Sequence, residues 1–172
     1  MTATPEPVSA EDAARVYAIA AALRTKDTEQ IRRHFGFRKI ACAAEAVLGG
    51  SPNCAHGEND GDQIDAFYYA TCEGQYLRPS GIGQPLDALT NMEVYGAYRI
   101  PKKRDSGYEY SIVLIDHASA REGYAWEAIV DNGEMIGLLF SCSLSPEELI
   151  AARHYAAPVP TPEPTPSATP AP

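Results

Sequence analysis

The chain has 172 residues, a length typical of one domain, and 45% of them are apolar, which suffices for a single core. The formal net charge is −9, and residues 41–75 include several acids but no Lys or Arg. Such a surface repels phosphate backbones, so nucleic acid is excluded as a partner. The longest apolar runs fall well short of the roughly 20 residues of a membrane span, so no transmembrane segment is expected.

The N-terminal part of the chain is expected to be helical. Ser9 is a suitable N-cap for an amphipathic helix that ends near Arg24. Asp27 begins a short second helix, and Gly36 ends it. The alanine-rich residues 39–48 are expected to form a third helix. The apolar face of the first helix consists of Val16, Ile19, Ala20 and Leu23.

Strand patterns dominate the rest of the chain. The first two candidates are residues 64–73 and 92–101, and three more lie between Tyr108 and Ser143. These last three read YEYSIVLIDH, YAWEAIVD and EMIGLLFSCS. An Asn-Gly pair separates the last two runs, and Asn-Gly between apolar strands predicts a tight hairpin.

Helices followed by consecutive strands predict an α+β fold. We expect the N-terminal helices to pack on one curved antiparallel sheet of about five strands, with a short C-terminal helix that begins at Ser145-Pro146. The domain is expected to span residues 9–156, after a flexible tail of residues 1–8. Residues 157–172 are rich in Pro and Thr and are expected to be a disordered tail or linker.

The chain contains four cysteines in no CxxC spacing, which argues against zinc or redox motifs. Two disulfides fit an exported protein, whereas four thiols fit a cytoplasmic one. The Pro/Thr-rich tail favours an extracellular or cell-surface location, with the cytoplasm as the alternative. Four cysteines allow three pairings, of which we prefer Cys42–Cys54 and Cys72–Cys142.

The opening helices, AARVYAIAAALRTKDTEQIRRHF, and the late strands, YEYSIVLIDH and GYAWEAIVDNGEMIGLLF, carry a family resemblance. They resemble the nuclear-transport-factor-two-like (cystatin-like) superfamily of cone-shaped folds, in outline from Ser9 to Phe140. Members of that superfamily include cyclases, isomerases, dehydratases and many non-catalytic binding modules. The resemblance therefore implies a fold and does not decide an activity.

An enzyme of this shape would place acid–base groups in the cavity between sheet and helices. The candidates to line such a cavity are His34, Tyr98, Tyr110, Asp116 and Trp126. Asp116 and His117 cannot both do so, because adjacent strand residues point to opposite faces. We expect this pair and His154 to be surface residues, since no Ser-His-Asp or Cys-His spacing supports catalysis.

The acidic residues between Asn53 and Gln63 resemble a calcium loop but lack its 12-residue pattern. We expect a solvated turn there, with no metal site and no cofactor elsewhere. The residues in question are Cys54, His56, Glu58, Asp60 and Asp62.

Both faces of the late sheet are apolar. The face expected to meet the helices carries Tyr110, Ile112, Leu114, Tyr124, Trp126, Val130, Ile136, Leu138 and Phe140. The opposite face carries Val113, Ile115, Ile129, Met135 and Leu139. Either the connection formed by residues 78–91 covers that outer face, or a second copy does, which would make a homodimer.

These features favour an exported or surface-tethered, non-catalytic module that binds an unknown protein or small ligand. The alternative is a small cyclase- or isomerase-like enzyme that uses the cavity between sheet and helices. Cavity chemistry separates them, because an enclosed pocket with converging polar groups indicates an enzyme, whereas a filled apolar core indicates a module.

Overall fold

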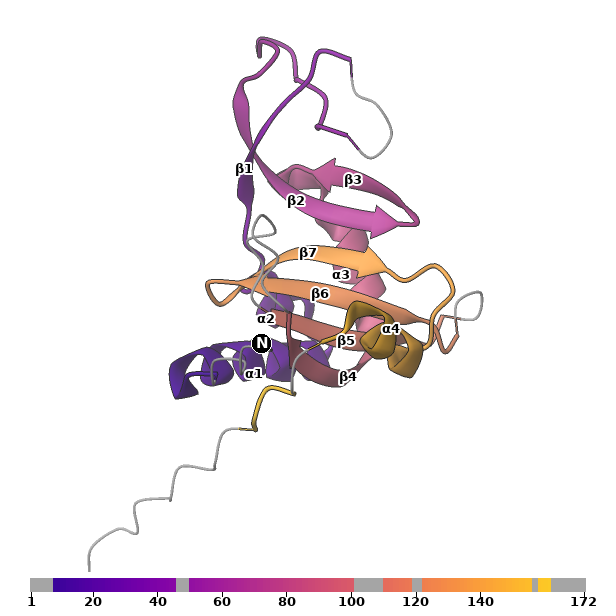
Figure 1. Ribbon diagram of the computed structural model, residues 1–172. Helices are drawn as coiled ribbons and strands as arrows, with labels where there is room; N and C mark the ends of the chain where they lie inside the picture. The colour runs from indigo at the N-terminus through magenta and orange to yellow at the C-terminus, as the bar shows by residue number, and fades with distance from the viewer. Residues whose placement is uncertain (1–7, 46–49, 101–109, 119–121, 156–157, 162–172) are drawn as a thin grey trace, which may run out of the picture.

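The structure is a computed structural model, and it describes residues 8–45, 50–100, 110–118, 122–155 and 158–161. It is an α+β fold with an open, mixed sheet of seven strands (Figure 1). The strand order is β1-β2-β7-β6-β5-β4, and β3 pairs with β2. The elements are α1 (Ala10–Thr25), α2 (Thr28–Arg32), β1 (Arg38–Ala41), β2 (Gln63–Thr71), β3 (Glu73–Leu77), a 3₁₀ turn (Pro79–Gly81), α3 (Gly83–Thr90), β4 (Met92–Arg99), β5 (Tyr110–Asp116), β6 (Ala125–Asp131), β7 (Glu134–Phe140) and α4 (Pro146–Arg153).

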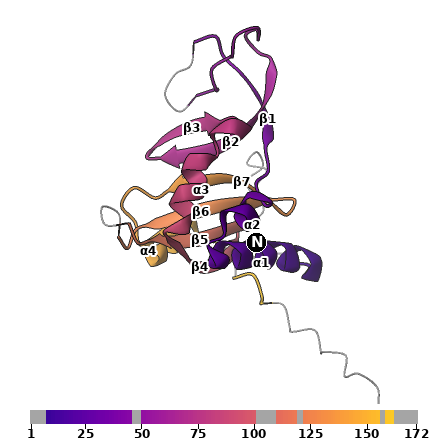
Figure 2. The same ribbon diagram turned by 180° about the vertical axis from the view of Figure 1, so that it is seen from behind.

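The prediction of α+β is confirmed, but the sheet is larger than expected and is not purely antiparallel. Strands β2 and β7 run parallel, with Tyr69 opposite Leu138. Strands β1 and β3 account for the two that the sequence did not reveal as strands. The sheet has helices on both sides: α1, α2 and α3 on one face and α4 on the other (Figures 1 and 2).

The two N-terminal helices begin where the sequence predicts. The Ser9 hydroxyl accepts a hydrogen bond from the Asp12 backbone N–H at 3.0 Å, which caps α1. The Asp27 carboxylate caps α2 in the same way, through the backbone N–H groups of Glu29 and Gln30. The predicted apolar face of α1 is buried and belongs to the main core cluster.

The predicted third helix, residues 39–48, is wrong over the part that the structure describes. Residues Arg38–Ala41 form β1, in which Ile40 lies opposite Ile64 of β2. The backbone N–H of Cys42 then donates to the Asp62 carbonyl at 2.8 Å. Pairing with a strand more than 20 residues away overrides the helix preference of alanine, which is worth less than about 1 kcal/mol per residue.

The predicted strand 64–73 is confirmed as β2 up to Thr71, but it ends there and the chain turns back into β3. Cys72 has a positive φ of 74° and reverses the chain between β2 and β3. Thr71 then lies opposite Glu73, and Tyr68 lies opposite Tyr76. The sequence did not predict strand β3, because its residues, EGQYL, show neither apolar alternation nor a run of β-branched residues.

The late meander forms as expected. Asn132 and Gly133 both have positive φ, as a tight hairpin turn between β6 and β7 requires. A β-bulge lies between Ile129 and Val130 and changes the register there, so that Met135, not Ile136, joins the main core cluster. The assignment of these two residues to faces was therefore wrong. Most of the other residues assigned to the helix-side face do belong to that cluster, although Tyr124 is 39% exposed.

Helix α4 covers the outer sheet face. Leu149 of α4 packs with Val113 and Ala125 in a second buried cluster. Of the two covers expected from the sequence, the one formed by residues 78–91 was wrong. The 78–91 connection instead packs on the helix side, where α3 buries Leu86 and Leu89. Since Val113 and Ile129 of the outer face are buried within one chain, a second copy is not needed to cover them. Ile115 and Leu139 are partly buried, and homodimerisation stays a prediction.

The folded chain extends past the predicted boundary at residue 156. Val159 is only 2% exposed and belongs to the main core cluster. Its backbone N–H donates to the Ala97 carbonyl of β4 at 2.9 Å. Among the described helices, none has the length and apolar character needed to cross a membrane.

We expect adjacent leucines of β7 to differ sharply in their contribution to stability. Leu138 is fully buried in the main cluster, so Leu138→Ala should lower the free energy of unfolding by about 3 kcal/mol. Leu139 points to the other face and is only partly buried, so Leu139→Ala should cost about 1 kcal/mol. Urea denaturation of both variants measures the difference. Equal costs would contradict the assignment of faces.

Candidate functional site

The predicted cavity residues Asp116 and Trp126 are brought together by the sheet. Asp116 ends β5 and is 1% exposed, so the expectation that it is a surface residue was wrong. Trp126 lies on the neighbouring strand β6. The indole Nε1–H of Trp126 donates to Asp116 Oδ2 at 2.9 Å. The backbone N–H of Ala118 donates to Asp116 Oδ1 at 2.8 Å. Both carboxylate oxygens thus hold protein groups in place, which is a structural arrangement.

Aromatic rings fill the space around this pair. Trp126 is fully buried and stacks on Tyr69, with ring centroids 6.0 Å apart. The ring of Phe140 is tilted against the indole, with ring centroids 4.8 Å apart. Towards the opposite end of the same face, Phe35 packs on Phe67 at 4.7 Å. Tyr110, another predicted cavity residue, is 6% exposed and belongs to the same core. The helix-side face is therefore a packed core over the described residues.

His34 does not join Asp116. The His34 carbonyl accepts a hydrogen bond from the Met135 N–H, at the start of β7. Asp116 lies near the other end, beside Trp126, which is opposite Phe140 at the end of β7. Five residues of strand separate these two ends, or roughly 16 Å at 3.3 Å per residue. The two acid–base candidates therefore cannot act on one substrate atom.

His34 instead borders a shallow groove of about 240 Å³ between α1 and α2. Partial burial lowers the pKa of its imidazole. The groove is open to solvent, and its lining contains no carboxylate. The lining residues are Ala18, Ala21, Ala22, Thr25, Gln30, Arg33 and His34.

Tyr98 was expected in the cavity and lies on the other face. A β-bulge between Val94 and Gly96 shifts the alternation of β4, so Ala97 enters the core and Tyr98 points outward. The Tyr98 ring stacks on Tyr155, with centroids 5.6 Å apart. His117 is exposed beside Glu93, and His154 is exposed at the end of α4, as expected for both.

A polar cluster on the outer face was not predicted. Glu127 of β6 is 3% exposed, and the Arg153 guanidinium donates to its Oε2 at 3.2 Å. The Tyr155 hydroxyl donates to Glu127 Oε1 and also lies 3.2 Å from Ser111 Oγ. Burial, and then the Glu127 charge, raise the pKa of the Tyr155 phenol far above its usual range, so it remains a donor. The sequence signal for this cluster was a glutamate inside the apolar run YAWEAIVD. Its partners, Arg153 and Tyr155, lie outside the sheet and far along the chain, so the sequence did not identify them.

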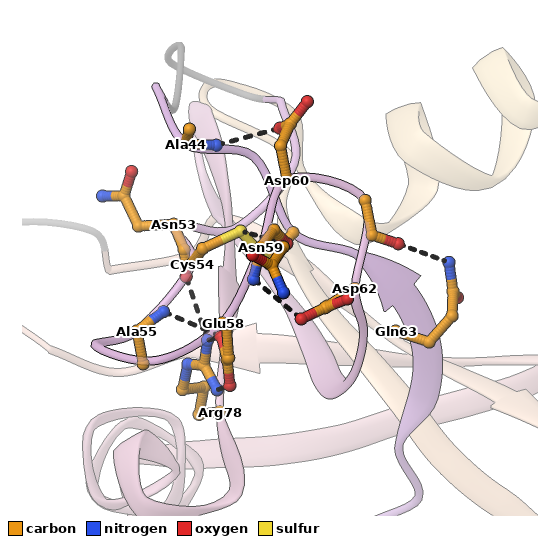
Figure 3. The surroundings of a disulfide bond; sticks show 12 residues. Ala44, Asn53, Cys54, Ala55, Glu58, Asn59, Asp60, Asp62, Gln63 and Arg78 are labelled. Atoms are coloured by element: carbon orange, nitrogen blue, oxygen red, sulfur yellow. Dashed lines mark hydrogen bonds and ion pairs between the residues drawn. A yellow bond between two sulfur atoms is a disulfide. The ribbon is translucent and has the colours of Figure 1, made fainter.

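The Cys42–Cys54 disulfide closes a projecting part of the chain that we call the lobe, the described residues between 42 and 62. Both predicted disulfides are present, the second being Cys72–Cys142. Within the lobe, the Ala43 N–H donates to the Pro52 carbonyl at 2.9 Å, and the Gly61 N–H donates to the Cys42 carbonyl at 2.9 Å. The lobe is thus internally bonded as well as cross-linked (Figure 3).

The carboxylates of the acidic loop, which was expected to be a solvated turn, form hydrogen bonds that fix the lobe. Glu58 forms a two-pronged ion pair with Arg78, at 2.9 and 2.6 Å, which ties the lobe to the end of β3. Asp60 accepts from the Ala44 N–H at 3.0 Å, and Asp62 accepts from the Asn59 N–H at 2.7 Å (Figure 3). The hydrogen bonds from Arg78, and then that from the Ala55 N–H, lower the pKa of Glu58.

Comparison of the chain with models of protein families, with curated proteins and with solved structures finds no match. In the polar clusters centred on Asp116, Glu127 and Glu58, the polar groups bind one another. Such clusters hold a fold together and are poor candidates for catalysis.

Replacing Glu58 should change how stability depends on pH. Because the pKa of Glu58 is lower in the folded chain, its ion pair stabilises the fold above about pH 4.3, and the contribution is lost as the pH falls through the folded-state pKa. Glu58→Gln should therefore lower Tm at neutral pH, and its difference from the wild type should shrink as the pH falls below about 4.3. Thermal unfolding from about pH 2.5 to 7 measures this. Glu73→Gln, at an exposed position, is the control, and a Tm difference independent of pH would contradict the assignment.

Proposed function

We propose that the chain is an exported or surface-tethered, non-catalytic module that binds a partner protein or small ligand through its surface. The observation that carries this proposal is the filled interior. Trp126 is fully buried and donates its indole N–H to Asp116. An enzyme of cyclase or isomerase type would need space for a substrate in this region. The described interior therefore favours a module over the enzyme.

The proposed location rests on the cysteines. Two disulfides are typical of an oxidising, extracellular environment. The Pro/Thr-rich sequence from Pro158 onward is typical of an extended spacer, which suits a module held away from a surface. We propose an extracellular or cell-surface location on both grounds.

Membership of the nuclear-transport-factor-two-like superfamily is part of the same proposal. Its support is that the residues carrying the resemblance form a coherent unit. They form α1 and α2, which pack on one face of a curved sheet, and the β5–β7 meander that makes the centre of that sheet (Figures 1 and 2). Many members of that superfamily bind without catalysing, in keeping with a filled interior.

The lobe is the part of the surface best placed to meet a partner. It projects from the end of the molecule opposite α1 and residues 158–161, where the spacer begins (Figures 1 and 2). Its disulfide and internal hydrogen bonds hold it in one shape, so binding would cost little ordering entropy. We propose that the lobe presents the binding surface.

The single tryptophan reports directly on the interior. If the core is filled, small cyclic ketones, sterols and aromatic acids should leave the emission of Trp126 unchanged up to about 1 mM, the weak end of small-ligand affinity. A fluorescence titration against such a panel measures this. A saturable shift in emission that Asp116→Asn removes would favour the enzyme instead.

The lobe can be tested with a matched pair of variants. Screening against an array of extracellular proteins and glycans should give ligands that the wild type binds and that Glu45→Ala/His56→Ala loses, because both residues are exposed on the lobe. The control, Lys26→Ala/Glu29→Ala, changes two exposed residues at the other end and should retain them. Ligands lost with the control and kept with the lobe variant would place the surface elsewhere.

A further inference from the structure

The C-terminal segment wraps around the edge of the sheet. Helix α4 lies on the outer face, whereas Val159 enters the core on the helix side. Between these two, the chain passes the outer edge of β4, where Pro158 lies opposite Tyr98 in an antiparallel bridge. We call residues 158–161 the strap, and the surface that holds it, formed by Tyr17 of α1 with Ala97 and Tyr98 of β4, the slot.

The slot contacts the strap backbone on two sides. The Val159 N–H donates to the Ala97 carbonyl at 2.9 Å, as in a strand added to the sheet. The Tyr17 hydroxyl donates to the Val159 carbonyl at 2.9 Å and lies 3.3 Å from the Thr161 hydroxyl. Both hydrogen-bonding groups of the Val159 backbone are thus bound, one by the sheet and one by α1.

The side chain of Val159 sets the register. It is 2% exposed and belongs to the main core cluster, so the slot includes an apolar hole as well as backbone partners. Valine is the sole branched aliphatic residue in the sequence PVPTPEPTPSATPAP. Among the Pro-Xaa-Pro triplets of that sequence, this one alone can fill the hole with a branched aliphatic group.

The flanking prolines explain why the added strand ends the sheet. Along a strand, backbone N–H groups point alternately to the two sides, and that of Val159 points at β4. Residues 158 and 160 would therefore point N–H groups away from the sheet, but proline has none. The strap occupies the edge of β4 and offers no donors at these positions to a further strand.

We propose that the slot is a peptide-binding site for an extended segment with a branched aliphatic residue between two prolines. Residues 158–161 fill it within the same chain, and the same segment of a second copy fills it when two chains exchange their straps. A tethered segment competes at an effective concentration of about 1 mM, so exchange occurs only near that protein concentration. The proposal does not depend on the lobe or on the absence of catalysis.

The first test uses the full chain with an emptied slot. In Val159→Asp the strap can no longer occupy the apolar hole, so a labelled peptide of sequence PVPTPEP should bind this variant saturably and the wild type at least 10-fold more weakly. The control peptide PDPTPEP should not bind. Adding Tyr17→Phe to the variant should weaken binding by about 2- to 10-fold through loss of one hydrogen bond. Failure of PVPTPEP to bind, or equal binding of both peptides, would overturn the proposal.

If Val159→Asp proves unstable, the same peptide gives a second measurement. A ligand of the folded state raises Tm, so PVPTPEP should raise the Tm of the variant and PDPTPEP should not. A Tm that neither peptide changes would overturn the proposal.

The second test addresses exchange between copies. Wild-type chains carrying two different tags, mixed at about 1 mM and then diluted, should yield mixed dimers on native mass spectrometry. The Val159→Asp chain should yield none. Absence of wild-type dimers, or dimers that persist in the variant, would rule out a second copy as the occupant.

Discussion

The parallel pairing of β2 with β7 is the contact on which the rest of the molecule depends. It joins the first three strands to the late meander, with Tyr68 opposite Gly137 and Ala70 opposite Leu139. Gly137 permits the close approach, because a Cβ there would lie 3.2 Å from the Tyr68 carbonyl oxygen. Just beyond the paired residues, the Cys72–Cys142 disulfide fixes the two strands across 70 residues of sequence. Closing a loop of that length stabilises a fold by about 4 kcal/mol in the chain-entropy model.

The same pairing also closes the interior. It brings Tyr69 of β2 onto the face of Trp126, and it places Phe67 against Phe35. These rings pack against one another on the helix side of the sheet, over the residues that the structure describes. The parallel pairing thus contributes both to the stability of the core and to the aromatic packing on its helix side. The surface carries two further features. There the chain offers a cross-linked lobe at one end and an occupied slot at the other (Figure 1).

The sequence predicted features that depend on local chemistry. The caps at Ser9 and Asp27 and the turn at Asn132 lie where they were expected, and both cysteine pairings were correct. Prediction from the sequence failed where the structure of a segment depends on residues far away in the chain. Strand β1 depends on its partner β2, the parallel β2–β7 pair leaves no periodic signal, and the cover of the outer face comes from α4. Two β-bulges reversed the faces assigned to Tyr98 and Met135, because one extra residue flips the alternation after it.

The buried Glu127 on the outer face connects these parts. Burying the Glu127 carboxylate costs desolvation free energy, and the pairing with Arg153, whose side chain is 54% exposed, offsets only part of it. The value of Glu127 lies in position: Arg153 and Tyr155 can satisfy Glu127 only when the end of α4 lies in one place. Residue 155 is three positions before Pro158, so fixing Tyr155 delivers the strap to the edge of β4 in one register. The contacts of Glu127 thus act together with the buried side chain of Val159, which sets the register in the slot.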